Sequence, residues 1–109
     1  MIDAINEREP TRRRTLIEQA FTPDGAYTDP DDEVQGHDAL NALFERLQRQ
    51  ASPELRFSLL GPVDAHHQQA RFTWQYGIAG TATPLATGGD VAVFHNGRIR
   101  HLYAFFDQA

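Results

Sequence analysis

The spacing of hydrophobic residues changes near the middle of the chain, and this change restricts the folds open to it. In the first half, Leu40, Leu43, Phe44 and Leu47 recur at the spacing of one helical face. In the second half, apolar and polar residues alternate in segments rich in Val, Phe, Tyr, Trp and Thr, which is typical of strands. The pattern predicts an α+β domain with helices packed on one face of a curved antiparallel sheet.

Two helices are predicted in the first half. The first begins at Pro10, where a missing N–H costs nothing, and either Glu9 or Thr11 is its candidate cap. It ends at a turn over residues 22–25. The second helix takes Asp38 as its N-cap.

The remaining segments predict strands at hairpin spacing. The Asn96-Gly97 pair is the strongest hairpin signal, because a type I′ turn requires positive φ at both central residues. Looser connections are expected over residues 61–68 and 77–83. The predicted strands cover residues 26–28, 55–63, 69–78, 84–94 and 98–106.

Composition narrows the class of protein. The 109 residues suit one domain spanning residues 1–109, with 40% hydrophobic residues to build its core. The net charge of −5 repels phosphate backbones, so we expect no nucleic-acid partner. The lack of cysteine excludes a disulfide scaffold, a thiolate zinc site and a cysteine nucleophile. Neither a long apolar run nor a leader pattern is seen, so we expect no membrane partner and a cytoplasmic location.

Strand alternation places one carboxylate on an apolar face. Asp90 shares its face with Ala92 and Phe94. Burying a charged carboxylate there costs on the order of several kcal/mol, so Asp90 is expected to be paired, hydrated or protonated. The alternative is an ordinary hydrated carboxylate at the strand end, beside Gly88 and Gly89.

Asp29 is the second candidate carboxylate. Pro30 follows it, and a proline holds the preceding residue extended, which gives the carboxylate a defined direction. The alternative is a plain turn aspartate that precedes the acidic run at residues 31–33.

The histidines invite a comparison with metal sites. His66 and His67 are adjacent, so on a strand they point to opposite faces and cannot share one ion. No H-x-H or H-x-x-x-H spacing occurs, and we expect no metal and no cofactor. The nucleotide-binding patterns and the G-x-S-x-G serine elbow are also missing from the sequence.

Three segments together resemble the SnoaL-like, NTF2-like (nuclear transport factor 2) family, which includes ketosteroid isomerase. They are residues 21–30, residues 36–40, and residues 90–99 with their Asn-Gly turn. The stretch over residues 66–74 and the ending Phe105-Phe106 are similar to a bacterial subgroup of that family. The resemblance, over residues 6–106, implies a cone-shaped fold with helices on the concave face of the sheet and assembly as a homodimer.

The resemblance also implies roles for the two carboxylates. Asp29 stands where the isomerases keep a general base, and Asp90 stands where they keep the protonated acid of the oxyanion hole. Ile5 occupies the position of their tyrosine donor. Gly88 occupies the position where related epoxide hydrolases carry an arginine.

We therefore expect a pocket that binds a small, mostly apolar molecule bearing one carbonyl or hydroxyl group, with Asp29 and Asp90 as its polar groups. Part of the aromatic set is expected to form core instead. The candidate lining residues are Tyr27, Phe44, Phe57, Phe72, Trp74, Tyr76, Leu102, Ala104 and Phe106.

Two other functions stay open on this sequence. One is an isomerase, cyclase or lyase that works without a metal and uses Asp29 as its base. The other is a dimerisation or interaction domain that pairs through the outer sheet face, which carries Thr73, Gln75, Val91 and Val93.

Overall fold

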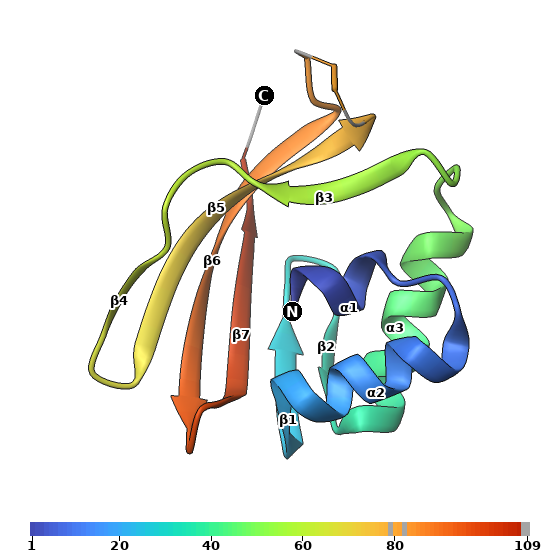
Figure 1. Cartoon of the computed structure of the whole chain (residues 1–109). Coiled ribbons are helices and arrows are strands. Elements are labelled where there is room, and N and C mark those ends of the chain that lie inside the picture. Colours follow the sequence, from blue (N-terminus) through green and yellow to red (C-terminus); the bar gives the residue numbers. More distant parts are fainter. Residues whose placement is uncertain (79, 82, 108–109) are drawn as a thin grey trace.

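The computed structural model describes residues 1–78, 80–81 and 83–107, which form three helices and one sheet (Figure 1). The helices are α1 (Ile2–Asn6), α2 (Pro10–Ala20) and α3 (His37–Arg49). The strands are β1 (Phe21–Thr28), β2 (Glu33–Gln35), β3 (Leu55–Leu59), β4 (Asp64–His66), β5 (Gln69–Ile78), β6 (Ala86–His95) and β7 (Arg98–Phe106). The predicted α+β class is confirmed.

The strands form an open mixed sheet in the order β2-β1-β7-β6-β5-β3, with β4 paired to β5. Strands β5, β6 and β7 make the predicted antiparallel meander. Strands β1 and β7 run parallel, so the prediction of a wholly antiparallel sheet is wrong at this pair. The two strands are joined through helices and other strands rather than through a hairpin, and such long connections permit parallel pairing.

The helix boundaries follow local capping. The carboxylate of Glu9 accepts the backbone N–H groups of Thr11 and Arg12 at 3.2 and 2.7 Å, which confirms a helix that begins at Pro10. The prediction for α3 is wrong by two residues, because Gly36, with φ of 92°, is its N-cap.

Asp38 lies inside the first turn of α3 rather than at its cap. Its carboxylate pairs with the guanidinium of Arg14 on α2, and this contact draws the side chain away from the backbone N–H groups of α3.

The structure forms strands in two segments that were predicted to be a turn or a loop, residues 22–25 and residues 61–68. Residues 22–25 lie within β1, where Phe21 pairs with Ile99 and Ala26 with His101. Between these pairs β1 advances five residues while β7 advances two, so a bulge replaces the predicted turn. The predicted strand over residues 55–63 ends at Leu59, and β4 forms inside the predicted connection.

The Asn96-Gly97 turn joins β6 to β7 as predicted. Both residues have positive φ, 52° at Asn96 and 80° at Gly97. In the other predicted connection, over residues 77–83, positions 79 and 82 lie outside the described residues.

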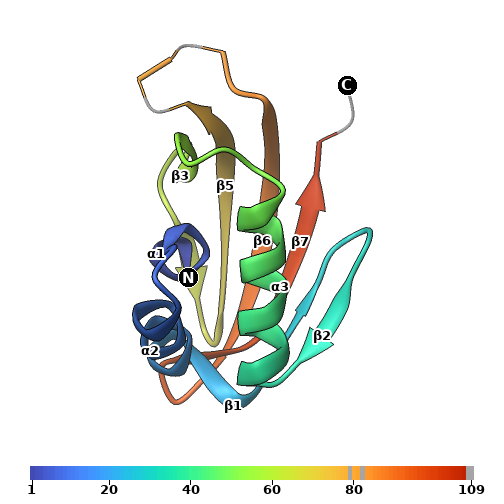
Figure 2. The same cartoon turned by 90° about the vertical axis from the view of Figure 1, so that its right-hand side faces the viewer.

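The core lies between the helices and the inner face of the sheet (Figure 2). Leu40, Leu43 and Phe44 of α3 are buried there, as the helical spacing predicts. Arg13 of α2 is also buried, and its guanidinium donates to the side-chain oxygens of Asn41 and Gln48 at 2.8 and 3.0 Å. No described helix combines the length and apolar character needed to cross a membrane.

Candidate functional site

A cavity of about 560 Å³ lies on the inner face of the sheet. Residues of β5, β6 and β7 form its floor, and α1, β1, β3 and the last turn of α3 contribute its sides. The structure brings both predicted carboxylates, Asp29 and Asp90, to this cavity. Six of the predicted lining residues also border it: Tyr27, Phe57, Trp74, Tyr76, Ala104 and Phe106.

Asp90 and Trp74 form the polar centre of the cavity. Asp90 is paired across the sheet with Phe72 and Ala104 and points to the inner face. Only 5% of Asp90 is exposed, and the indole Nε1 of Trp74 donates a 2.8 Å hydrogen bond to its Oδ1. Asp90 is therefore buried, and the alternative of a hydrated strand-end carboxylate does not hold.

Burial raises the pKa of Asp90 to about 6, because the charged form loses its hydration. The hydrogen bond from Trp74 opposes this rise, whereas the negative charge of Asp29 adds to it. Among the described residues no cationic side chain pairs with Asp90. The carboxyl can therefore gain or lose a proton near neutral pH, and a bound ligand can shift that balance.

Gly88 makes room for the indole of Trp74. The two residues are paired across β5 and β6. A Cβ at position 88 would lie 2.3 Å from the indole ring and 2.2 Å from the carbonyl oxygen of Phe105. Both distances are far below van der Waals contact, so Trp74 occupies the space that any side chain at position 88, including an arginine, would need.

Four aromatic rings form a continuous apolar wall around this centre. The ring of Trp74 lies 5.4 Å from that of Phe57 and 5.6 Å from that of Phe106, both at steep angles. Tyr76 packs on Phe57 with ring centroids 4.5 Å apart. These spacings are typical of stabilising aromatic pairs.

Asp29 is at once a turn residue and a cavity residue. Its Oδ1 accepts the backbone N–H groups of Asp31 and Asp32 at 2.8 and 2.7 Å, which is the geometry of an Asx turn. Its Oδ2 accepts the hydroxyl of Tyr27 at 2.8 Å. Burial and the neighbouring carboxylate raise the pKa of Tyr27 well above its usual range, so the phenol keeps its proton and donates.

Three of the predicted lining residues lie outside the cavity. Phe44 is fully buried and packs edge-on against Tyr27, with ring centroids 6.3 Å apart. Leu102 is fully buried in the core, and Phe72 packs against that core. The prediction does not hold for these three. For Phe72 and Leu102, strand alternation assigns a face of the sheet and not a depth along the strand. Phe44 belongs to α3, whose apolar face packs in the core.

Charged residues at the rim of the cavity escaped the sequence analysis. Arg46 of α3 pairs with Asp32, with Nη2 and Oδ2 2.5 Å apart. The hydroxyl of Thr87 donates to Asp107 at 2.6 Å. Asp31 and Asp32 belong to the acidic run of the sequence, but their position at the rim depends on how the chain turns between β1 and β2.

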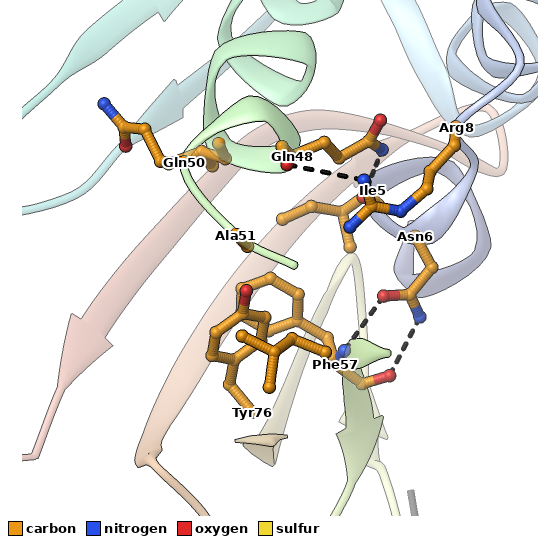
Figure 3. Close-up of a pocket in the computed structure, with 10 residues that line it drawn as sticks. Ile5, Asn6, Arg8, Gln48, Gln50, Ala51, Phe57 and Tyr76 are labelled. Carbon is orange, nitrogen blue, oxygen red and sulfur yellow. Dashed lines mark hydrogen bonds between the residues drawn. The ribbon is translucent and has the colours of Figure 1, made fainter. Parts of the chain in front are cut away.

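Helix α1 closes one end of the cavity and borders a second, smaller hollow of about 220 Å³ (Figure 3). The side-chain amide of Asn6 pairs with the backbone of Phe57 on β3, donating at 2.8 Å and accepting at 2.9 Å. Ile5 borders both hollows and is 6% exposed. The position that the resemblance assigns to a tyrosine donor is thus an apolar wall.

His66 is the last residue of β4, His67 follows it in the turn to β5, and neither lines the cavity. Their Nδ1 atoms are 2.9 Å apart, and Nε2 of His66 is 3.2 Å from the side-chain nitrogen of Gln69. Across residues 1–78, 80–81 and 83–107, no three His, Asp or Glu side chains group in a way that could hold a metal ion.

The family model of the SnoaL-like domain matches residues 1–102. A crystal structure of a SnoaL-like family protein from Agrobacterium tumefaciens, provisionally described as an isomerase, is 31% identical with a TM-score of 0.89, covering 98% of this chain and 91% of that chain. No match was found among curated proteins.

Two more distant structures share the fold. A protein with a ketosteroid isomerase-like fold from Catenulispora acidiphila, solved in complex with trimethylamine, is 16% identical with a TM-score of 0.76, covering 97% of this chain and 81% of that chain. A provisional polyketide cyclase from Sinorhizobium meliloti is 17% identical with a TM-score of 0.72, covering 94% of this chain and 87% of that chain.

Proposed function

Because the chain belongs to the SnoaL-like family, we propose that its cavity binds a small, largely apolar molecule that carries a carbonyl or hydroxyl group. One observation carries the proposal: the buried carboxyl of Asp90 stands among aromatic rings in a cavity of about 560 Å³. The rings take up the apolar body of the ligand, and Asp90 forms a hydrogen bond with its oxygen.

Binding can be followed without labels, because Trp74 is the only tryptophan of the chain and lies in the cavity. Neutral ketones and alcohols with an apolar body should change its fluorescence and raise the Tm. Asp90→Leu removes the carboxyl at similar volume and should weaken binding roughly tenfold. Val93→Thr, on the outer face of the same strand, is the control and should bind as the wild type does. A panel without response would refute the proposal.

Proton transfer next to a carbonyl is a second candidate, because Asp29 and Asp90 line the same cavity and three donors orient the carboxylate of Asp29. Asp29 takes the α-proton, the C–H electron pair forms the enolate, and protonated Asp90 donates a hydrogen bond to its oxygen. Each of these effects lowers the activation free energy by on the order of 3 kcal/mol.

Deuterium exchange tests this second candidate. Ketones that bind should exchange their α-protons in D₂O, as followed by proton NMR, and Asp29→Asn should reduce that exchange at least about a hundredfold. The fluorescence assay checks that this variant still binds. Glu33→Gln removes a carboxylate of the same acidic run that does not line the cavity, and it is the matched control. If ketones bind but their α-protons do not exchange, the proposed binding function stands and the catalytic role of Asp29 is excluded.

A further inference from the structure

The charges that face the cavity are unbalanced. Among the described residues that line it, Arg46 alone has a cationic side chain, and Asp32 already pairs with it. Met1 also borders the cavity, but burial lowers the pKa of its α-amino group and so weakens its charge. Five carboxylates border the same space: Asp29, Asp31, Asp32, Asp90 and Asp107.

Neutral groups solvate these carboxylates without cancelling their charge. Asp29 accepts hydrogen bonds from the phenol of Tyr27 and from two backbone amides. Asp90 accepts one from the indole of Trp74, and Asp107 accepts one from the hydroxyl of Thr87. Hydrogen bonds of this kind hold the carboxylates in place and leave a negative potential inside the cavity.

The apolar wall has the chemistry that suits a positive ligand. The π faces of aromatic rings attract cations, and indole attracts them most strongly. The rings of Phe57, Trp74, Tyr76 and Phe106 all border the cavity that the carboxylates face. A neutral apolar ligand would use these rings alone, whereas an ammonium group would use the rings and the carboxylates together.

We propose that the ligand of this cavity is a cation, an ammonium group on an apolar body, held between the aromatic wall and the carboxylates of the rim. This inference rests on the proposed binding function and specifies the charge of the ligand. The ammonium group supplies the positive partner that Asp90 lacks among the described residues and relieves the repulsion among the rim carboxylates.

A pair of probes of equal size separates charge from shape. Phenethylammonium carries the cation, and 2-phenylethanol places a neutral hydroxyl on the same carbon skeleton. The fluorescence of Trp74 measures both affinities. We expect the ammonium probe to bind roughly tenfold more tightly at low ionic strength. Added NaCl should weaken its binding and leave that of the alcohol unchanged.

Substitutions of the rim carboxylates test whether they cause the preference for the ammonium probe. Asp107→Asn and Asp31→Asn each remove one exposed carboxylate of the rim, and each should reduce the preference for the ammonium probe about two- to fivefold. Glu54→Gln changes the net charge equally at a position that does not line the cavity, and should keep the full preference. Circular dichroism verifies that each variant is folded.

The two probes also distinguish the possible failures. If the alcohol binds as tightly as the ammonium probe or more tightly, the cation proposal is overturned and the proposed binding function stands. If neither probe alters the fluorescence of Trp74 at its solubility limit, both proposals are overturned. A preference that Glu54→Gln reduces as much as Asp107→Asn does would reflect net charge alone, and would also overturn the cation proposal.

Discussion

Single residues set the chemistry of the cavity through a few close contacts. Trp74 reaches Asp90 because Gly88 leaves the space for its indole, and the hydrogen bond between the two side chains is 2.8 Å long. Tyr27, on β1, orients Asp29 through a hydrogen bond from its hydroxyl to the carboxylate. Asp29 and Asp90 are therefore each held by a specific neighbour, and removing that neighbour has a measurable consequence.

Asp90→Asn tests the protonation of the buried carboxyl. Because the pKa of Asp90 rises from 3.8 to about 6 on folding, the folded state binds this proton more tightly than the unfolded state does. The contribution of Asp90 to stability is thus greatest below about pH 4 and falls by about 3 kcal/mol as the pH rises through about 6.

Asparagine keeps an acceptor for Trp74 and removes this titration. Compared with wild type, Asp90→Asn should therefore be relatively more stable at about pH 7 than at about pH 4. Urea unfolding followed by the fluorescence of Trp74 measures the free energy of unfolding of both proteins at both pH values. If the free energies of unfolding of wild type and Asp90→Asn differ by the same amount at both pH values, the pKa of Asp90 is not raised.

Gly88→Ala should displace the indole of Trp74. The added Cβ meets both the ring and the backbone of Phe105, so we expect a loss of about 2–3 kcal/mol in stability and a red-shifted fluorescence maximum. Gly89→Ala is the matched control, because a Cβ there meets its nearest atoms, in Phe72 and Thr73, at 3.6 and 3.9 Å, ordinary contact distances. Equal effects of the two substitutions would contradict the close packing of Trp74.

At the scale of elements, the position of α1 decides how one end of the cavity is closed. This helix has only five residues, too few to be stable in isolation. Two hydrogen bonds from Asn6 to the backbone of Phe57 tie it to the edge strand β3 (Figure 3). Packing of Ala4 and Ile5 in the core completes its attachment.

Asn6→Ala should loosen α1 from the sheet. The loss of both hydrogen bonds should cost about 1–2 kcal/mol and should speed hydrogen exchange at the backbone amide of Phe57. Asp3→Ala, on the exposed side of the same helix, is the control and should leave that exchange rate unchanged. Unaltered exchange in Asn6→Ala would show that the core contacts alone hold the helix.

At the scale of the whole molecule, the outer face of the sheet lies opposite the cavity and is apolar in part. Val91 pairs with Tyr103 across β6 and β7, and Phe105 beside them is 63% exposed. Rows of apolar side chains on an exposed sheet commonly mark an interface. We propose that two copies of the chain associate through this face.

Phe105→Asp tests the proposed homodimer. A charge within the apolar row should convert a dimer into a monomer in sedimentation velocity at micromolar concentration. Leu85→Asp, at an exposed apolar residue that belongs to neither β6 nor β7, is the matched control and should stay dimeric. A wild-type chain that sediments as a monomer would rule out this interface.

Much of the fold follows from local sequence signals. Pro10 with Glu9, the apolar spacing of α3 and the Asn96-Gly97 turn each act within a few residues, so their structures could be predicted. The bulge in β1 and the parallel pairing of β1 with β7 could not, because both depend on contacts between distant segments. Local signals do not indicate helix α1 for the same reason, since its attachment is to β3.

Local sequence signals are enough to specify the fold class, the faces of the strands and the presence of one carboxylate, Asp90, on an apolar face. These properties follow from side-chain period and local chemistry, which the order of residues specifies directly. Tertiary packing sets which side chains reach the cavity: Phe44, Phe72 and Leu102 lie outside it, whereas Asp31 and Asp107 both border it. Depth and proximity depend on how the sheet curves around the helices, and that curvature is set by packing over the whole chain.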